Sequence, residues 1–272
     1  MKHGILWPPL IFGRLYRWYL AKARHPFRDK VLGKFWGFLS SIKVWVPYVD
    51  GLIIKVGARD YIQQKILLDG VYEPLLIDWI RKNLDEQDVF WDVGANIGSV
   101  TLISAIHCRE VVAFEPDTRL SKRLHDNIRA NQIKNVQVLN IALSDCAGET
   151  SLYLGPENNS GMNSMLAIPG STQIQIKTNT IDQLTEKNSL PFPTVMKVDV
   201  EGAEFLVFSG AKKTLDKNQL RTIIFESKEG PGQLPENYKI VEILKDAGFK
   251  INLFGRSDPE TTDTVNNYIA TR

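Results

Sequence analysis

WDVGANIGSV, residues 91–100, decides the fold, because it joins a strand pattern to a helix pattern through a glycine-containing turn. The apolar run Val89 to Trp91 is typical of a buried strand, and residues 99–107 are typical of a helix. Gly94 and Gly98 allow the backbone to approach a ligand, and the start of the helix offers unpaired N–H groups to an anion. The stretch therefore predicts a nucleotide-type binding turn.

The same order of strand, turn and helix repeats further along the chain. Residues 111–114 form a second apolar run, and residues 118–131 carry Leu120, Leu124 and Ile128 at helical spacing. Further strands are expected at 136–141, 194–198 and 222–225, and further helices at 203–215 and 241–247. This alternation predicts a doubly wound α/β fold with a mostly parallel sheet and helices on both faces.

Two segments depart from the alternation. Residues 151–154 and 173–177 alternate polar and apolar side chains, which predicts a hairpin-like insertion of half-exposed strands. Residues 249–254 and 268–269, separated by a polar turn, predict a terminal antiparallel pair. We expect both segments to be additions to the parallel sheet.

The charge of the 272 residues divides unevenly along the chain. Residues 1–45 hold nine basic residues and one acid, a net +8, so the overall +2 leaves −6 for the rest. Four of the six tryptophans also lie in this arm. We therefore expect a basic aromatic arm (1–45), an extension that packs on the catalytic domain (46–84, where Gly70 and Pro74 interrupt any long helix) and the catalytic domain itself (85–272).

The arm permits two interpretations. Its apolar run is broken by Pro8 and Pro9 and followed by Arg14 and Arg17, so neither a membrane span nor a cleaved signal peptide is expected. In a helix over residues 9–24, the apolar set would be Leu10, Phe12, Leu15, Tyr16, Tyr19 and Leu20, and the basic set Arg14, Arg17, Lys22 and Arg24. This mix predicts either contact with a membrane surface or packing on protein.

A dinucleotide-binding oxidoreductase would use a related turn. Its G-x-G-x-x-G fingerprint needs glycines where this chain has Asn96 and Ser99, which disfavours a pyrophosphate site and NAD. Glu115 follows Asp92 by 23 residues, at the end of the next strand, where an acid accepts hydrogen bonds from both ribose hydroxyls. The pattern favours another adenosine-containing cofactor.

Four motifs together resemble one family. WDVGANIGSVTLIS, VVAFEPD, NIALSD and KVDVEGAEFLVFSGA, in this order, are similar to the FkbM-type S-adenosylmethionine-dependent methyltransferases over roughly residues 70–227. The resemblance implies a seven-stranded sheet, bound S-adenosyl-L-methionine and methylation of a hydroxyl on a sugar, glycan or polyketide-like acceptor. The chain departs from the family pattern only at residues 106–110, and the first 45 residues lie outside the resemblance.

The resemblance also implies a role for each cofactor-binding residue. Backbone around Gly94, Asn96 and Gly98 would take the methionine part, and Asp92 would hold its ammonium group. Glu115 would hold the ribose. Ser144 and Asp145 would reach the adenine amino group, because an acid accepts hydrogen bonds from an amine.

Three charged residues end the fourth predicted strand. Lys197, Asp199 and Glu201 alternate, so strand geometry sends them to one side, at the edge of the sheet where ligands bind. We expect Asp199 to act as general base or orienting acceptor for the hydroxyl, with Glu201 or Glu204 as the alternative base. No metal is expected, although Asp199, Glu201 and Glu226 form an alternative magnesium site.

Other function classes remain or fall away. The alternatives kept open are an NAD-dependent oxidoreductase and a non-catalytic module that anchors a glycan-assembly complex to the membrane. No nucleic acid partner is expected, because the fourth strand ends in Asp-Val-Glu-Gly and the body is acidic. The loop at residues 158–163 would shape the acceptor pocket.

The two cysteines lack the spacing of a metal or redox site, and we expect a cytoplasmic protein. If the arm binds a membrane, we expect residues 1–45 to contact its inner face.

Overall fold

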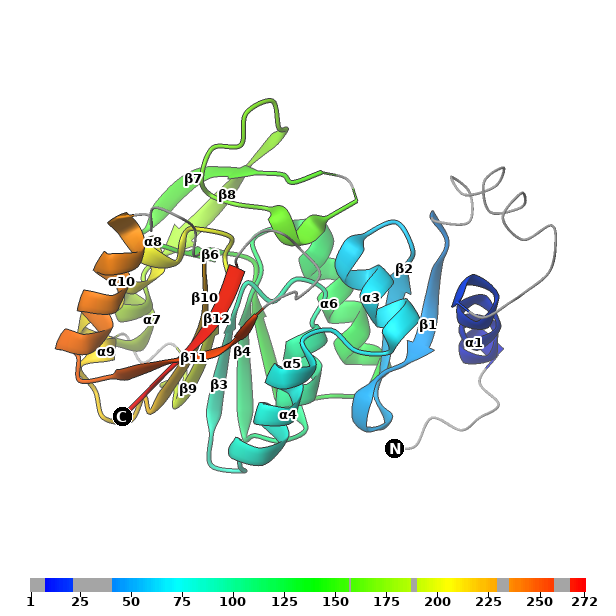
Figure 1. The fold of residues 1–272 in the computed structure, drawn as a ribbon, viewed down its shortest axis with the longest axis horizontal. Coiled ribbons are helices and arrows are strands. Elements are labelled where there is room, and N and C mark those ends of the chain that lie inside the picture. Colours follow the sequence, from blue (N-terminus) through cyan, green and yellow to red (C-terminus); the bar gives the residue numbers. More distant parts are fainter. Residues whose placement is uncertain (1–7, 22–40, 157, 187–189, 229–234, 257–264) are drawn as a thin grey trace.

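A computed structural model describes the chain except for residues 1–7, 22–40, 157, 187–189, 229–234 and 257–264. Its centre is a seven-stranded sheet in the order β11-β12-β10-β9-β3-β4-β5 (Figure 1). All neighbours pair in parallel except β12, which runs antiparallel to both β10 and β11. The strands are β3 (Val89–Val93), β4 (Glu110–Phe114), β5 (Val136–Leu139), β9 (Val195–Val198), β10 (Thr222–Lys228), β11 (Lys250–Arg256) and β12 (Val265–Thr271). The predicted α/β sheet and its terminal antiparallel pair are confirmed.

Helices cover both faces of this sheet, as the alternating pattern predicted (Figure 1). Successive strand residues point to opposite faces, so Phe90 packs with one set of helices while its neighbour Trp91 packs with the other. One face carries α3 (Tyr61–Asp69), α4 (Pro74–Asn83), α5 (Ser99–Ala105) and α6 (Thr118–Ala130). The other carries α7 (Ile181–Glu186), α8 (Glu204–Ser209), α9 (Lys212–Leu215) and α10 (Pro235–Asp246).

The helix predicted for residues 203–215 is wrong as a single helix, because the chain forms α8 and then α9. The Gly210 carbonyl accepts a hydrogen bond from the Asp182 N–H of α7 at 3.0 Å. The carboxylate of Asp182 in turn accepts from the N–H groups of Lys213 and Thr214, at 3.0 and 2.8 Å, which caps a new helix start. The break depends on a residue 28 positions earlier in the chain, and a local pattern does not contain it.

The insertion forms a small sheet of its own above the carboxyl ends of β3 and β4 (Figure 1). β7 (Gly148–Tyr153) and β8 (Gln173–Asn179) pair antiparallel, as the alternating residues predicted. The two-residue β6 (Ala142–Leu143) adds a parallel neighbour to β8. A pairing so short leaves no periodicity in the sequence, so this third strand was not expected.

The N-terminal part forms a hairpin that continues the body on the α6 side (Figure 1). β1 (Lys43–Pro47) and β2 (Ile53–Gly57) pair antiparallel around the short 3-10 turn η1 (Val49–Gly51). Gly70 ends α3 in a left-handed conformation and Pro74 begins α4, so both residues interrupt the helix as predicted.

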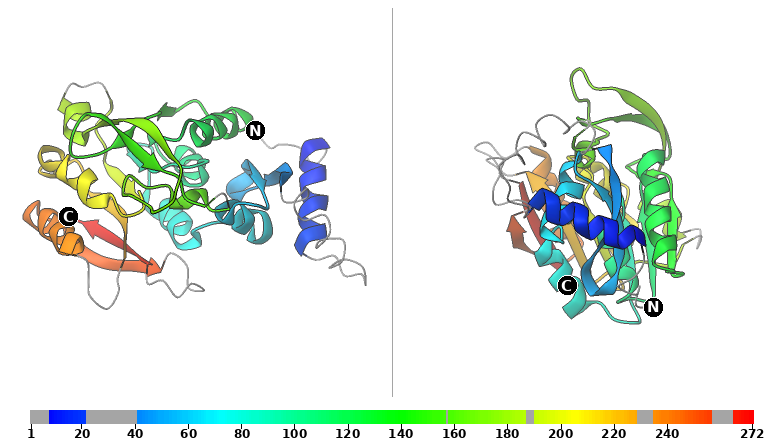
Figure 2. Two further views of the ribbon diagram at one scale, coloured as in Figure 1. Left: turned by 90° about the horizontal axis from the view of Figure 1, so that it is seen from above. Right: turned by 90° about the vertical axis from the view of Figure 1, so that its right-hand side faces the viewer.

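The arm contributes α1 (Pro8–Ala21), which crosses β1 on its outer side (Figure 2). Tyr16 is buried there, and the Arg17 guanidinium donates hydrogen bonds to the carbonyls of Pro47 and Ile66 at 3.4 and 3.0 Å. Arg17 is therefore engaged by protein, and its expected availability to lipid phosphates is wrong. Leu15 also differs from expectation, because it points away from Tyr16 and is 60% exposed.

Candidate functional site

Polar residues of three neighbouring strands share one face of the sheet near its carboxyl edge. Asp92 of β3 lies in register with Lys197 of β9 and Ile224 of β10, and Glu226 lies two residues beyond Ile224 on β10. By the two-residue period of strands, these positions share the face of Phe90, Val195 and Ile224, which α4 and α5 cover. The sheet thus carries its charges toward α4 and α5, at the edge where parallel sheets bind ligands.

The buried Lys197 forms an ion pair with Asp199, whose side chain is partly exposed. The Lys197 Nζ lies 2.9 Å from the Asp199 Oδ2. Burial acts to raise the pKa of Asp199, but the Lys197 ammonium and hydrogen bonds from Glu226 and Lys197 outweigh it and hold that pKa below its usual value. The charges of Asp199, Glu73 and Asp92 outweigh burial at Lys197 and raise its pKa. Both partners are therefore ionised at neutral pH.

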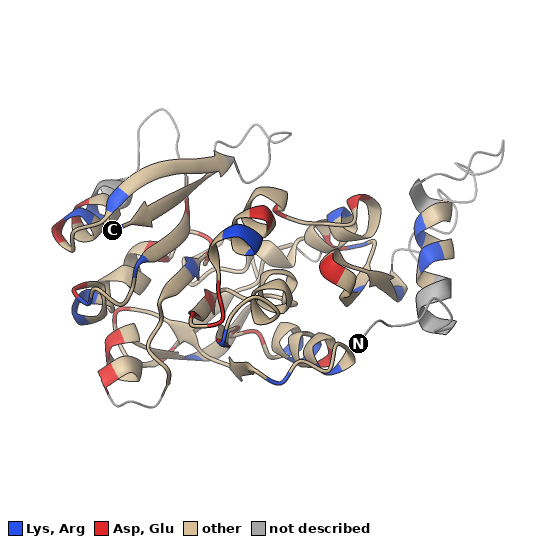
Figure 3. Ribbon diagram, turned by 90° about the horizontal axis from the view of Figure 1, so that it is seen from below, with Lys and Arg blue, Asp and Glu red and all other residues tan. Residues whose placement is uncertain are grey.

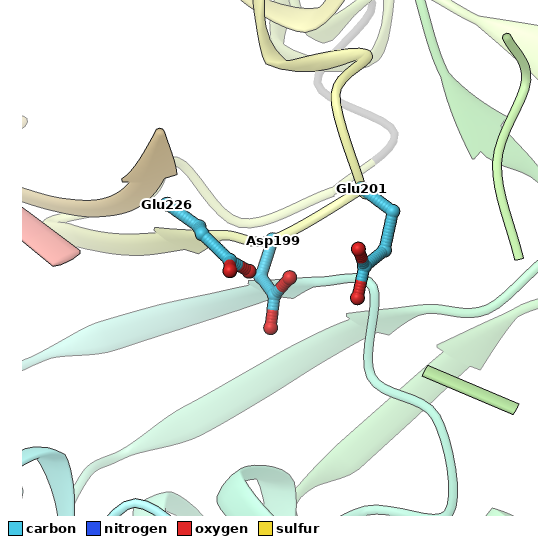
Figure 4. Close-up of side chains that lie close together, drawn as sticks. All are labelled: Asp199, Glu201 and Glu226. Carbon is cyan, nitrogen blue, oxygen red and sulfur yellow. The ribbon is translucent and has the colours of Figure 1, made fainter. Parts of the chain in front are cut away.

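Two further carboxyl groups meet Asp199, with its carboxyl between theirs (Figure 4). One oxygen each of Asp199, Glu201 and Glu226 lies within 4.8 Å of the others. Burial, and then the charge of Asp199, raise the pKa of Glu226 to about 11, so Glu226 is protonated and donates to Asp199. Among the described residues these three form the one group able to hold a metal ion, but the adjacent Lys197 ammonium disfavours a cation.

Asp92 lies behind this cluster and does not line a pocket. It is fully buried, its Oδ2 accepts from the Thr101 hydroxyl at 2.5 Å, and its Oδ1 has no hydrogen-bond partner among the described residues. Burial raises its pKa. In the structure, Asp92 interacts with the charge of Lys197. Its contact with the ammonium group of the cofactor remains a prediction.

A pocket opens at the ends of β3, β4 and β9. Its walls include five residues that the sequence singled out: Gly94, Asn96, Glu115, Asp199 and Glu201. The Glu115 carboxylate accepts from the backbone N–H groups of Asn96 and Asp117, both at 2.8 Å. Burial raises the pKa of Glu115 to about 8. The turn after β3 and the end of β4 thus place an acid on the pocket wall.

Gly94 is required for the packing of the turn after β3 against the end of β9, rather than for the approach of a ligand. Its φ is +87°, and a Cβ built on it would collide with the Asp199 carbonyl. The turn after β3 therefore fits against the end of β9 only if residue 94 has no side chain. Gly98 does not line the pocket, because it faces the Leu124 side chain of α6.

The pocket wall that follows β5 differs from the residues inferred from the resemblance. Ile141, Ala142 and Leu143 line it, whereas Ser144 and Asp145 do not. Asp145 is exposed and accepts a hydrogen bond from the Ser144 hydroxyl at 3.1 Å. Lys197 does not line the pocket either, because its side chain is buried. It contacts the pocket residue Asp199 through the ion pair.

The loop of the insertion forms the wall opposite the sheet. It contains the 3-10 turn η2 (Ser160–Met162), and Ser160, Gly161 and Asn163 line the pocket. The Ser160 N–H donates to the Asp60 carboxylate at 2.8 Å, and the Asn163 amide donates to Asp117 at 3.3 Å. The loop is thus tied to α3 and to the start of α6.

One acid that influences the site, Glu73, lies in a place that the sequence did not single out as catalytic. Glu73 precedes α4 with a left-handed φ of 52° and interacts with Lys197 and Asp199; burial raises its pKa to about 7. Glu201 and Asn96 share this rare conformation for non-glycine residues, which gathers at functional sites. The sequence carries no signal for Glu73 beyond the helix start at Pro74. Only the packing of α4 on the sheet brings it to the site.

Glu204, the alternative base, has a structural position. It is buried, and its carboxylate accepts from the N–H groups of Val200 and Gly202 at 3.0 and 3.2 Å. Burial raises its pKa to about 7. The carboxylate therefore holds the turn that presents Glu201.

Comparisons with known proteins agree with this arrangement. Residues 92–251 match the model of the methyltransferase FkbM domain. The chain is 35% identical to the hexuronic acid methyltransferase AglP of Haloferax volcanii over 140 residues, which are 52% of this chain and 56% of that protein. It is 24% identical to the 2-O-methyltransferase NoeI of Sinorhizobium fredii over 212 residues, 68% of this chain and 86% of that protein. The match to AglP thus spans little more than half of that relative's length.

One solved structure supports the fold. The crystal structure of the methyltransferase FkbM from Methylobacillus flagellatus aligns with a TM-score of 0.52 and 15% identity, covering 78% of this chain and 52% of the other. The matched region begins at Asp92 and includes the pocket residues of β3, β4 and β9. The chain belongs to the FkbM methyltransferase domain family, which confirms the resemblance seen in its sequence.

Proposed function

We propose that the protein transfers a methyl group from S-adenosyl-L-methionine to a hydroxyl group of a sugar or glycan. The observation that carries this proposal is an ionised Asp199 on the wall of the same pocket that contains Glu115. Family membership and the names of the two relatives support methyl transfer to a sugar-like acceptor. A polyketide-like acceptor has no comparable support.

The residues of the pocket fit this cofactor. Glu115, Asp199 and Glu201 line it, and acids suit a ligand that carries a positive ammonium and a positive sulfur. When bound, S-adenosyl-L-methionine supplies a methyl group on a positively charged sulfur. Glu115 would accept hydrogen bonds from the ribose hydroxyls, and the backbone of Gly94 and Asn96 would contact the methionine part.

Asp199 would act on the acceptor rather than on the cofactor. The positive charge on sulfur disappears during transfer, so a carboxylate held against it would favour the ground state. Placed beside the acceptor hydroxyl, the Asp199 carboxylate orients the oxygen and accepts its proton as the bond to methyl forms. Lys197 keeps Asp199 ionised, and Glu226 donates a hydrogen bond that fixes its orientation.

A magnesium-assisted mechanism is the second candidate. The spacing of the Asp199, Glu201 and Glu226 oxygens favours it, since magnesium prefers carboxylate ligands. It requires Glu226 to be ionised, whereas the first candidate requires Glu226 to carry a proton. This difference separates the two by experiment, as described in the Discussion.

Removal of the Glu115 carboxylate should weaken cofactor binding. We expect Glu115→Ala to lower the affinity for S-adenosylmethionine by about 5- to 150-fold, because two hydrogen bonds with the ribose hydroxyls, each contributing about 0.5 to 1.5 kcal/mol, are lost. Titration calorimetry measures this change. Asp145→Ala is the control, since Asp145 lies outside the pocket and should leave affinity unchanged. Tight binding of NAD together with no binding of S-adenosylmethionine would refute the cofactor assignment.

We also propose that α1 contacts a membrane surface from the cytoplasmic side. Within the described part of the chain, no helix combines the length and the apolar character needed to cross a bilayer. Leu15 and Trp18 are 60% and 56% exposed on α1. Both charged residues of α1 are basic, Arg14 and Arg17, and Arg14 is exposed (Figure 3). Exposed apolar and basic side chains on one helix suit an anionic lipid interface.

Liposome sedimentation tests this contact. We expect the protein to sediment with vesicles containing phosphatidylserine and to be released by salt, which screens the attraction. The double substitution Leu15→Ser with Trp18→Ser should abolish sedimentation. Leu253→Ser is the matched control, because Leu253 is equally exposed, at 63%, on β11. Wild-type protein that stays in the supernatant at low salt would leave packing on β1 as the role of α1.

A further inference from the structure

A large groove lies beside the cofactor pocket. It encloses about 910 Å³ and runs between the β1–β2 hairpin, the start of α6 and the insertion. The groove and the cofactor pocket share the wall residues Leu120, Ser160 and Asn163. A ligand of sugar size or larger in the groove would therefore lie next to the cofactor.

The groove carries an excess of basic residues on an otherwise acidic body. Its lining contains four basic side chains and two acidic ones; the basic ones are Lys43, Arg59, Arg119 and Arg123, and the acidic ones are Asp60 and Asp117. Residues 46–272, by contrast, have a net charge of −6. The positive groove is a local departure from the charge of the body.

Internal contacts use both acids. The Asp60 carboxylate accepts from the N–H groups of Gln63 and Ser160, at 3.1 and 2.8 Å. Asp117 accepts from two nitrogens of Arg119, at 3.0 and 2.6 Å, so these two charges cancel. Asp60 is therefore the one acid of the lining whose charge acts on Lys43 and Arg123.

The two positive charges of Lys43 and Arg123 exceed the single negative charge of Asp60. The Arg123 Nη2 donates to the Lys55 carbonyl and the Gln63 side chain, at 3.0 and 2.7 Å, which fixes the guanidinium in the wall. Burial, and then the positive charges of Arg123 and Lys55, lower the pKa of Lys43, and the charge of Asp60 opposes them only in part. Within the described part of the chain, no carboxylate forms an ion pair with Lys43. An anion placed here would relieve the repulsion between these cations.

We infer that this groove binds an anionic group, a carboxylate or a phosphate, on the acceptor sugar or glycan. The inference rests on the proposed function and deepens it. The cofactor pocket carries the ionised Asp199, which repels an anion, so the acceptor presents its hydroxyl there and its negative group to the groove. Charge thus orients the acceptor across the two neighbouring hollows.

Matched sugars test the inference by calorimetry on the full chain saturated with S-adenosylhomocysteine. Methyl glucuronoside and methyl glucoside differ only in the carboxylate, and glucose 6-phosphate provides the phosphate arm. We expect at least one anionic probe to bind about tenfold or more tightly than methyl glucoside, the effect of one hydrogen bond to a charged group. Whichever anion binds more tightly identifies the source of the charge.

Substitution at Lys43 then locates the site. Lys43→Gln should remove about tenfold of the affinity for the anionic probe and leave methyl glucoside and S-adenosylhomocysteine binding unchanged. Lys122→Gln is the control, because Lys122 is exposed on α6 beside Arg123 but does not line the groove.

Three results would overturn the inference: equal binding of the neutral and anionic sugars, no detectable binding of either anion, or an equal loss of S-adenosylhomocysteine binding in Lys43→Gln. The last result would assign the groove to the carboxylate of the cofactor. Failure of the proposed function looks different, because the anion preference would persist while no methyl transfer from S-adenosylmethionine occurs.

Discussion

Asp199→Asn should lower the rate of methyl transfer by about 10²- to 10⁴-fold, the contribution of a general base. The amide keeps the shape of the side chain but does not accept a proton. Affinity for S-adenosylmethionine should stay close to that of the wild type, because Glu115 and the turn after β3 are untouched. Turnover and calorimetry on the same preparation measure the two effects separately. A variant with near-normal turnover would remove Asp199 from the role of base.

The Asp199 substitution also leaves the Lys197 ammonium without its partner, 2.9 Å away in the native protein. Loss of one partner of a fully buried pair costs about 3 to 5 kcal/mol of folding stability, and the partial exposure of Asp199 makes the cost smaller here. Thermal unfolding of Asp199→Asn therefore has to show a folded protein at the assay temperature before its turnover is interpreted.

Glu226→Gln separates the two candidate mechanisms. In the first candidate, Glu226 is protonated and shares its proton with Asp199. Glutamine is also a neutral donor, so turnover should stay within about tenfold of the wild type, a much smaller change than the loss of a general base. A magnesium site needs the charge of Glu226, so the same variant would then lose activity, and excess magnesium would partly restore it. Loss of activity in Glu226→Gln, together with inactivation by a chelator, would support the metal site and contradict proton sharing between Glu226 and Asp199.

Gly94→Ala should be severely destabilising and should abolish methyl transfer. The left-handed conformation costs a non-glycine residue about 1 to 2 kcal/mol, and overpacking costs about 1 to 3 kcal/mol more. The new Cβ would collide with the Asp199 carbonyl, so the end of β9 must move and the Asp199 carboxylate with it. Denaturant unfolding measures the free energy of unfolding. Turnover, measured below the unfolding midpoint temperature, shows the loss of activity.

Gly248→Ala provides the control for the backbone term. Gly248 has the same φ of +87°, and a Cβ there meets nothing within 4 Å. It should cost only the left-handed term of about 1 to 2 kcal/mol and keep full activity. The difference between the two variants isolates the collision with Asp199. Equal losses of stability in both would contradict the close fit between the turn and β9.

The sequence was sufficient for the elements whose signals are local. The strands around Phe90 and Val112 and the helical stripe of Leu120 follow from apolar periodicity, and each bears out its prediction. The end of α3 follows from Gly70 and the start of α4 follows from Pro74, because each residue acts on the backbone at its own position. These properties need no distant partner.

Distant contacts decided the features that the sequence did not reveal. The split between α8 and α9 depends on Asp182, and the short β6 exists only because β8 offers it an edge. Glu73 reaches the site because α4 packs on the sheet, and the neutral state of Glu226 depends on its burial beside Asp199.

The amino-acid sequence alone determined the α/β alternation, the glycine turn after Asp92 and the family to which the chain belongs. Only the tertiary structure decided which acids share a proton, which residues line the pocket and where the positive groove lies. The reason is physical. Periodicity and turn chemistry act over a few neighbouring residues, whereas burial and charge interactions depend on groups that are close in space and far apart along the chain.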